Sequence, residues 1–217
     1  MIEVVLWDND GVLVDTETMF FETTRAAFAR LGLELTRELW GRHYLSEGMT
    51  SGGIAALLGG DAERVAVMLD KRNEEYRQIL SQPPPLRPRV REILGMLAGH
   101  VRMAIVTGSP RNQLQLMLGS SGLLGIFEAT VTGDDCSHSK PDPEPYLTAL
   151  KRLNVGASHC IAVEDSPRGL ASARAAGVPC MVVPTELTRM LDFTGALAVE
   201  EDVSAILRHI RQDPACC

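Results

Sequence analysis

Two aspartates at the end of a short apolar segment are the first residues in this sequence that point to chemistry. Asp8 and Asp10 follow the β-rich run Ile2–Trp7, and Gly11 then allows a sharp turn. Two carboxylates at a strand edge can divide their roles, one ionised and one protonated, when their surroundings differ. Taken alone, Asp-x-Asp-Gly also suits an ordinary turn or a calcium loop, so the pair needs support from elsewhere in the chain.

Three later segments give that support, because each places polar residues at the carboxyl end of an expected strand. They are Thr107-Gly108-Ser109 after Met103–Val106, Lys140 after Ala129–Thr132, and Glu164-Asp165 after Cys160–Val163. Parallel strands end at one edge of a sheet, so these residues should meet Asp8 and Asp10 in one crevice. Carboxylate oxygens suit Mg²⁺, and a hydroxyl and an ammonium suit a phosphate group. Thr107 could equally be a turn residue and Lys140 a solvated loop lysine if each stood alone.

The elements that must position these residues follow two different patterns. Beyond residue 86, strands alternate with helices over about 130 residues, which predicts a doubly wound, Rossmann-like parallel sheet of the α/β class. The expected helices are Val90–Leu97, Gln113–Leu118, Pro145–Leu153 and Gly169–Ala176, and a fifth strand is expected at Pro179–Val183. From Thr16 to Leu80 the pattern is helical throughout, with no expected strand. The prolines at 83–85 and 88 favour a stiff crossing. We therefore expect a Rossmann-like core formed by residues 1–15 and 86–217, with an inserted all-helical domain at residues 16–85.

Composition limits the classes of partner. The net charge is −7 with no dense Lys/Arg run, which argues against nucleic acid as a ligand and requires a phosphate site to supply its own positive charge. Five cysteines without CxxC spacing favour a reducing cytoplasm. No apolar stretch approaches 18 residues, so neither export nor a membrane anchor is expected. No heptad pattern indicates stable assembly, and we expect a monomer or a weak homodimer. The tail Gln212–Cys217 is expected to be loose, and Cys216-Cys217 has no assigned role.

Taken together, the motifs resemble the haloacid dehalogenase-like superfamily, in the branch with a helical C1-type cap inserted after the first motif. This branch contains phosphoglycolate phosphatases and β-phosphoglucomutases. The resemblance covers essentially the whole chain through VLWDNDGVLVDTE, AIVTGSP, KPDPEPY and IAVEDSPRGL, in that order. It implies a Mg²⁺-dependent phosphatase that hydrolyses a small phosphate monoester, such as a sugar phosphate, with residues 16–85 as the cap.

The resemblance also implies a role for each motif residue. Asp8 would attack phosphorus to form an aspartyl phosphate, and Asp10 would act as general acid and then general base. Thr107, Gly108, Ser109 and Lys140 would bind the phosphoryl group. Mg²⁺ would be held by Asp8, Asp165 and the backbone carbonyl of Asp10. Glu164 would either bind the ion through water or only orient its neighbours.

Departures from the family pattern narrow the activity. Members that cleave carbon–halogen bonds lack the aspartate that is present here as Asp10, so dehalogenation is not expected. Phosphonate-cleaving members need a cap lysine, but the only lysine between Thr16 and Leu80 is Lys71, which lies in a charged helical run, so that activity is not expected either. Mutases of this branch typically carry a histidine near the start of the cap, where this sequence reads Met19-Phe20-Phe21. Hydrolysis is therefore favoured over mutase activity, although Phe20 could equally be ordinary helix core. A phosphosugar mutase and a non-catalytic phosphate-ester-binding relic remain the alternatives.

The cap offers candidates for recognising the leaving group. The glycine-bounded segment Leu45–Gly53 could read the substrate or could simply join two helices. Arg42, His43 and Arg111 are candidate substrate contacts, and Asp15 and the triple proline would form hinges. The motifs recognise only the phosphoryl group, so sugar phosphates, phosphoglycolate and nucleotide monophosphates all remain possible substrates.

Overall fold

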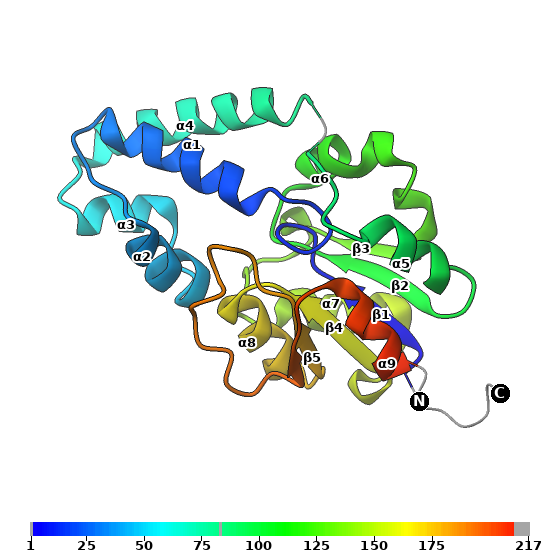
Figure 1. Cartoon of the computed structure of the whole chain (residues 1–217). Helices are drawn as coiled ribbons and strands as arrows, with labels where there is room; N and C mark the ends of the chain where they lie inside the picture. The colour runs from blue at the N-terminus through cyan, green and yellow to red at the C-terminus, as the bar shows by residue number, and fades with distance from the viewer. Residues whose placement is uncertain (1, 83, 211–217) are drawn as a thin grey trace.

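A six-stranded parallel sheet forms the centre of the protein, which we describe from a computed structural model covering residues 2–82 and 84–210. Pro83 and the tail residues 211–217, Cys216 and Cys217 included, lie outside the described residues. The strand order is β3-β2-β1-β4-β5-β6 (Figure 1). The strands are β1 (Val4–Trp7), β2 (Arg102–Val106), β3 (Ala129–Val131), β4 (Cys160–Glu164), β5 (Cys180–Val182) and β6 (Ala198–Val199). The predicted doubly wound α/β core is confirmed.

Side chains alternate between the two faces of the sheet, and both faces are buried. In β1, Val5 and Trp7 pack into one apolar cluster, and Val4 and Leu6 pack into the other. All four are fully buried. A short run that is apolar at every position suits a parallel strand covered on both sides, which is why the alternation of a half-exposed strand is absent here.

Helices cover each face. On the Val5/Trp7 side lie α5 (Val90–Leu97), α6 (Arg111–Leu118) and α9 (Ile206–Ile210). On the opposite side lie α7 (Glu144–Leu153) and α8 (Pro167–Ala175). Single 3₁₀ turns join these elements: η2 (Gly119–Ser121), η3 (Leu124–Ile126), η4 (Gly133–Asp135), η5 (Ala157–His159) and η6 (Val203–Ala205).

The inserted segment is helical, as predicted, and forms its own apolar cluster. It contains α1 (Glu17–Ala29), α2 (Arg37–Leu39), a π-helical turn η1 (Trp40–Ser46), α3 (Ser51–Leu57) and α4 (Ala62–Ile79). Side chains cap three of these helices: Thr36 accepts from the N–H of Leu39 at 3.2 Å, Thr50 from that of Gly53 at 3.1 Å, and Asp61 from that of Arg64 at 3.0 Å. No described residue of this segment belongs to a strand of the sheet. Figure 1 shows these helices grouped on one side of the sheet.

Contacts from the loop after β5 help to tie the helical segment to the core. Leu187, from the loop after β5, is buried in the apolar cluster of the helical segment, and Arg37 pairs with Glu186 at 2.9 Å. The two chain crossings also pair with each other: Val14 and Leu86 form an antiparallel bridge, and the N–H of Asp15 donates to the carbonyl of Pro85 at 3.0 Å. The boundaries at residues 15/16 and 85/86 stay a prediction, and this pairing lies where they were expected.

Some elements were not predicted from the sequence, and the predicted starts of others differ from those observed. The two-residue strand β6 and the short helix α9 were not expected, because neither is long enough to show a period. Helices α6, α7 and α8 begin one or two residues earlier than expected, an ordinary error at helix ends. Among the described residues, no helix combines the length and the apolar character that crossing a membrane would require.

Candidate active site

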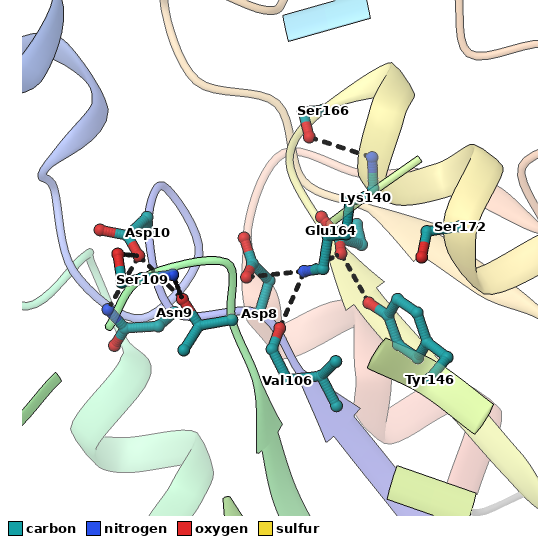
Figure 2. A network of polar contacts seen from close by, with 12 residues as sticks. Asp8, Asn9, Asp10, Val106, Ser109, Lys140, Tyr146, Glu164, Ser166 and Ser172 are labelled. Carbon is teal, nitrogen blue, oxygen red and sulfur yellow. Dashed lines mark hydrogen bonds and ion pairs between the residues drawn. The ribbon is translucent and has the colours of Figure 1, made fainter. Parts of the chain in front are cut away.

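The register of the central strands brings the motifs together. Trp7, the last residue of β1, is level with Ile105 of β2 and Val163 of β4, so the residues that follow these strands meet at one edge. Figure 2 shows the side chains of Asp8, Lys140 and Glu164 converging there, with Asp10 and Ser109 beside them. These residues of the four motifs therefore lie together at the edge of the sheet where the sequence predicted them.

Lys140 is the centre of this cluster. Its ammonium donates to Oδ1 of Asp8 at 2.9 Å, to Oε1 of Glu164 at 2.7 Å and to the carbonyl of Val106 at 2.8 Å. The hydroxyl of Tyr146 donates to the same oxygen of Glu164 at 2.6 Å. Burial alone would lower the pKa of Lys140, but the charges of Asp8 and Glu164 outweigh it and raise that pKa. Lys140 is therefore a buried cation, not a solvated loop lysine.

Asp8 is poorly placed to be ionised by the protein alone. Burial raises the pKa of Asp8 to about 8, because the attraction of Lys140 only partly offsets desolvation and the repulsion of Glu164 and Asp10. A nucleophile must be ionised at neutral pH. For the predicted role of Asp8, positive charge beyond that of Lys140 would favour the ionised form.

Asp8, Glu164 and Asp165 fit a divalent cation. Each offers one carboxylate oxygen, and these oxygens lie within 4.8 Å of one another. Oδ2 of Asp165 and Oε2 of Glu164 are buried without a hydrogen-bond partner. Burial raises the pKa of Asp165 well above its usual range, and neighbouring carboxylates add to the rise. Mg²⁺ prefers such oxygen ligands and would relieve their mutual repulsion. Oε1 of Glu164 already accepts from Lys140 and Tyr146, an arrangement that agrees with the expected orienting role.

Asp10 is held by three hydroxyl groups. Thr16 donates to its Oδ1 at 2.7 Å, and Thr107 and Ser109 donate to its Oδ2 at 3.1 and 2.8 Å. The predicted phosphate-binding hydroxyls of Thr107 and Ser109 therefore also orient Asp10. The turn needs Gly11, whose φ is +78° and where a Cβ atom would overlap Oδ2 of Asp165.

A cavity of about 760 Å³ opens above this cluster and is lined by residues of both the sheet edge and the helical segment. Asp8, Asp10, Lys140 and Asp165 line it from the sheet side, as do Gly108 and Ser109. From the helical side, the predicted segment Leu45–Gly53 contributes Leu45 and residues 48–52. Phe20 also lines the cavity and is only partly buried, so it is not simply helix core. The volume suits a small metabolite.

The predicted substrate contacts Arg42, His43 and Arg111 are not supported by the cavity lining, and they stay a prediction. Arg42 and His43 bind Glu47 at 3.3 and 2.7 Å, and Arg111 binds Asp135 at 2.6 Å. None of the three lines the cavity. Each of these side chains is paired with a carboxylate outside the cavity, and the sequence pattern alone does not reveal these partners.

Sequence reasoning missed two arginines that do line the cavity. Arg168 lies 4.4 Å from the ring centroid of Tyr44, and Arg72 lies 4.5 Å from that of Phe20. Near Arg168, Glu17 is buried and accepts from the indole of Trp40 at 3.2 Å. Burial raises the pKa of Glu17, which the charge of Arg168 partly offsets. Arg168 could have been found from its position in the fourth motif, whereas nothing in the sequence distinguishes Arg72 from the other charged residues of its helix.

Comparison with known proteins decides the family. The family model for haloacid dehalogenase-like hydrolases matches residues 5–183 of the sequence. The chain belongs to the haloacid dehalogenase-like hydrolase family. It is 33% identical over 183 residues to the phosphorylated carbohydrates phosphatase of Thermotoga maritima, a match that covers 82% of each chain.

Two solved structures resemble this family member closely. One is CbbY from Rhodobacter sphaeroides in complex with xylulose-(1,5)-bisphosphate, with a TM-score of 0.76 and 25% identity over 93% of this chain and 95% of the other. The second is a protein from Thermotoga maritima described as a "putative beta-phosphoglucomutase", with a TM-score of 0.72 and 28% identity over 96% of this chain and 99% of the other. The family therefore includes both hydrolytic and mutase relatives of this chain.

Proposed function

We propose that this protein is a Mg²⁺-dependent phosphatase that hydrolyses a small phosphorylated carbohydrate through an aspartyl phosphate on Asp8. The observation that carries the proposal is the buried cluster in which Lys140 bridges Asp8 and Glu164 beside Asp165. Phosphoryl transfer depends chiefly on positioning and on neutralising charge, and this cluster offers a nucleophile, a fixed cation and ligands for a second cation.

The side chains divide the work of two displacements. In the first, an oxygen of Asp8 forms a bond to phosphorus while the ester P–O bond breaks, and Asp10 gives its proton to the departing alcohol. In the second, Asp10 takes a proton from water as the water attacks phosphorus and releases Asp8 and phosphate. Lys140 balances negative charge on Asp8 and on the phosphoryl oxygens. Asp8, Asp165 and the carbonyl of Asp10 would hold Mg²⁺, which supplies further positive charge when bound.

Arg72 suggests which alcohols the cavity accepts. Arg72 as a whole is only 5% exposed, and its guanidinium donates to Thr24, Ser51 and Asn73, all of which are neutral acceptors. No carboxylate among residues 2–82 and 84–210 forms an ion pair with it. A buried cation without a counter-charge is costly. A second anionic group on the substrate would supply one, which favours sugar bisphosphates and phosphorylated sugar acids.

Phosphate release tests the proposal directly. We would assay p-nitrophenyl phosphate, glucose 6-phosphate and fructose 1,6-bisphosphate with Mg²⁺ and with EDTA, using the native protein, Asp8→Asn and the exposed control Asp70→Asn. Release that needs Mg²⁺, disappears in Asp8→Asn and persists in the control is expected. Release that survives Asp8→Asn would show that another group is the nucleophile.

An assay with β-glucose 1-phosphate examines the mutase alternative. No histidine occupies positions 19–21, and Phe20 lines the cavity there, so the chain offers no basic group at the place where mutases of this branch carry one. We expect no conversion of β-glucose 1-phosphate to glucose 6-phosphate. Conversion without net phosphate release would assign the protein to the mutases.

Arg72→Met tests the choice of alcohol, with the exposed Arg64→Met as control. The KM for fructose 1,6-bisphosphate should rise about tenfold or more, as expected for loss of one charge-assisted contact. The KM for p-nitrophenyl phosphate should change little, since that ester carries no second anion. Equal changes for the two esters would remove Arg72 from substrate recognition.

A further inference from the structure

Arg87, at the second chain crossing, is a half-buried arginine without a described carboxylate in hydrogen-bond contact. All of its described side-chain hydrogen bonds go to backbone carbonyls. One guanidinium nitrogen donates to the carbonyls of Gly11 and Val183, and the other donates to the carbonyl of Pro184 at 3.2 Å. A planar, forked group can join acceptors from separate segments in this way.

Of the two segments that it joins, one carries Asp10, and the other is hydrogen-bonded to the strand that ends in Glu164. Gly11 directly follows Asp10 in the turn that Gly11 N and Val14 O close at 2.9 Å. On the other side, the N–H of Val183 donates to the carbonyl of Glu164 at 2.7 Å, next to Asp165. The segments also touch each other, because Cγ2 of Thr185 lies 3.1 Å from the place that a Cβ of Gly11 would occupy. Arg87 therefore does not line the cavity but joins the turn after Asp10 to the segment that follows β5.

The backbone of Arg87 connects this contact to the helical segment. Its N–H donates to the carbonyl of Leu13 at 3.0 Å, so the crossing that returns from the helices is hydrogen-bonded to the turn that leaves Asp10. A shift of the turn would move Asp10 away from the leaving oxygen, and a displacement of about 1 Å can cost about a hundredfold in rate.

We propose that Arg87 is a positioning residue that fixes the Gly11 turn, and through it Asp10, against the segment that follows β5. The inference rests on the proposed phosphatase function, since it concerns the protonation of the leaving group. It predicts a dependence on the leaving group that a purely structural arginine would not produce. An acidic nitrophenol leaves without a proton, whereas the less acidic phenol needs the proton of Asp10.

The test compares p-nitrophenyl phosphate with phenyl phosphate, two esters of similar shape. We would measure kcat/KM with Mg²⁺ for Arg87→Met, Arg87→Lys and the control Arg91→Met, because Arg91 also donates to a carbonyl, that of Ser121, but is exposed. This ratio covers every step up to the departure of the alcohol. Thermal unfolding of each variant would accompany the assays.

In both Arg87 variants we expect kcat/KM for phenyl phosphate to fall at least about tenfold further than for p-nitrophenyl phosphate, within the range that general acids contribute. Lysine should not rescue the loss, since one ammonium does not reproduce the fork. Arg91→Met should leave both ratios unchanged. If Arg87→Met does not fold, Arg87→Lys decides. Equal losses on the two esters, or no loss, would overturn the positioning role, whereas a native protein inactive on both esters would contradict the phosphatase proposal instead.

Discussion

Replacing Lys140 by methionine should destabilise the protein strongly when Mg²⁺ is absent. The substitution keeps most of the volume of the side chain but removes the ammonium that lies between Asp8 and Glu164. Both carboxylates are nearly inaccessible, at 7% and 0% exposure, so water cannot replace the lost partner. The chain must then either bury uncompensated charge or take up protons.

The expected size follows from this burial. Breaking a buried ion pair by removing one partner costs about 3–5 kcal/mol in the free energy of unfolding. For a chain of this size, each kcal/mol lowers the melting temperature by about 2–4 °C, so a decrease of roughly 6–20 °C is expected. Tyr146 still donates to Glu164, which favours the lower part of the range.

Urea unfolding at pH 7.5 with EDTA measures the effect. Lys151→Met, at an exposed lysine of α7, is the matched control and should change stability by less than about 0.5 kcal/mol. Adding Glu164→Gln to Lys140→Met should recover part of the loss, because one uncompensated charge disappears. A loss below about 1 kcal/mol in Lys140→Met would refute the view that this ammonium compensates buried carboxylates.

Three further outcomes are expected. Gly11→Ala should lower the free energy of unfolding by about 1–3 kcal/mol and abolish the stabilisation by Mg²⁺, because the new methyl group meets the carboxylate of Asp165, an expected metal ligand. The control Gly32→Ala, with a similar φ of +73° but open space around it, should keep that stabilisation. Equal responses of the two variants to Mg²⁺ in urea unfolding would contradict this prediction. Thr16→Val should lower kcat by about tenfold without a comparable change in KM, because Asp10 loses a donor; an unchanged kcat in phosphate-release assays would count against it. The pKa of Asp8 rises from 3.8 to about 8 on folding, so the folded state binds the extra proton between these values and loses stability as the pH rises through them. Mg²⁺ prefers the ionised form, and calorimetry should show a larger increase in melting temperature at pH 8 than at pH 5, the reverse order being inconsistent with this reasoning.

The sequence was sufficient to predict the site wherever a residue follows a buried strand. Asp8, Lys140 and Asp165 could be placed together because parallel strands share one carboxyl edge, and chain order alone determines which residues stand there. Their polar types then indicated the chemistry. This part of the fold depends on periodicity and strand order, both of which a single sequence contains.

Residues contributed by helices were harder to predict. Arg72 lines the cavity and Arg42 does not, yet both are arginines in charged helical segments, and what separates them is tertiary: α4 packs against α1, whereas Arg42 pairs with Glu47. The π-helical turn η1 also shifts the facing of its residues from the α-helical period on which sequence reasoning relies. Substrate recognition therefore lay largely beyond the reach of the pattern.

The central position of β1 has a consequence for how this chain folds. Val4 pairs with Arg102 on one side and with Cys160 on the other, so the strand that carries the nucleophile forms its hydrogen bonds only with distant segments. During synthesis β1 leaves the ribosome long before β2 and β4, so its four apolar residues have no strand to pair with until those segments are made. Contacts so far apart in sequence slow folding. The active site is therefore among the last parts of the protein that can form, and a chain that stops before β4 lacks one of the two strands that flank the nucleophile.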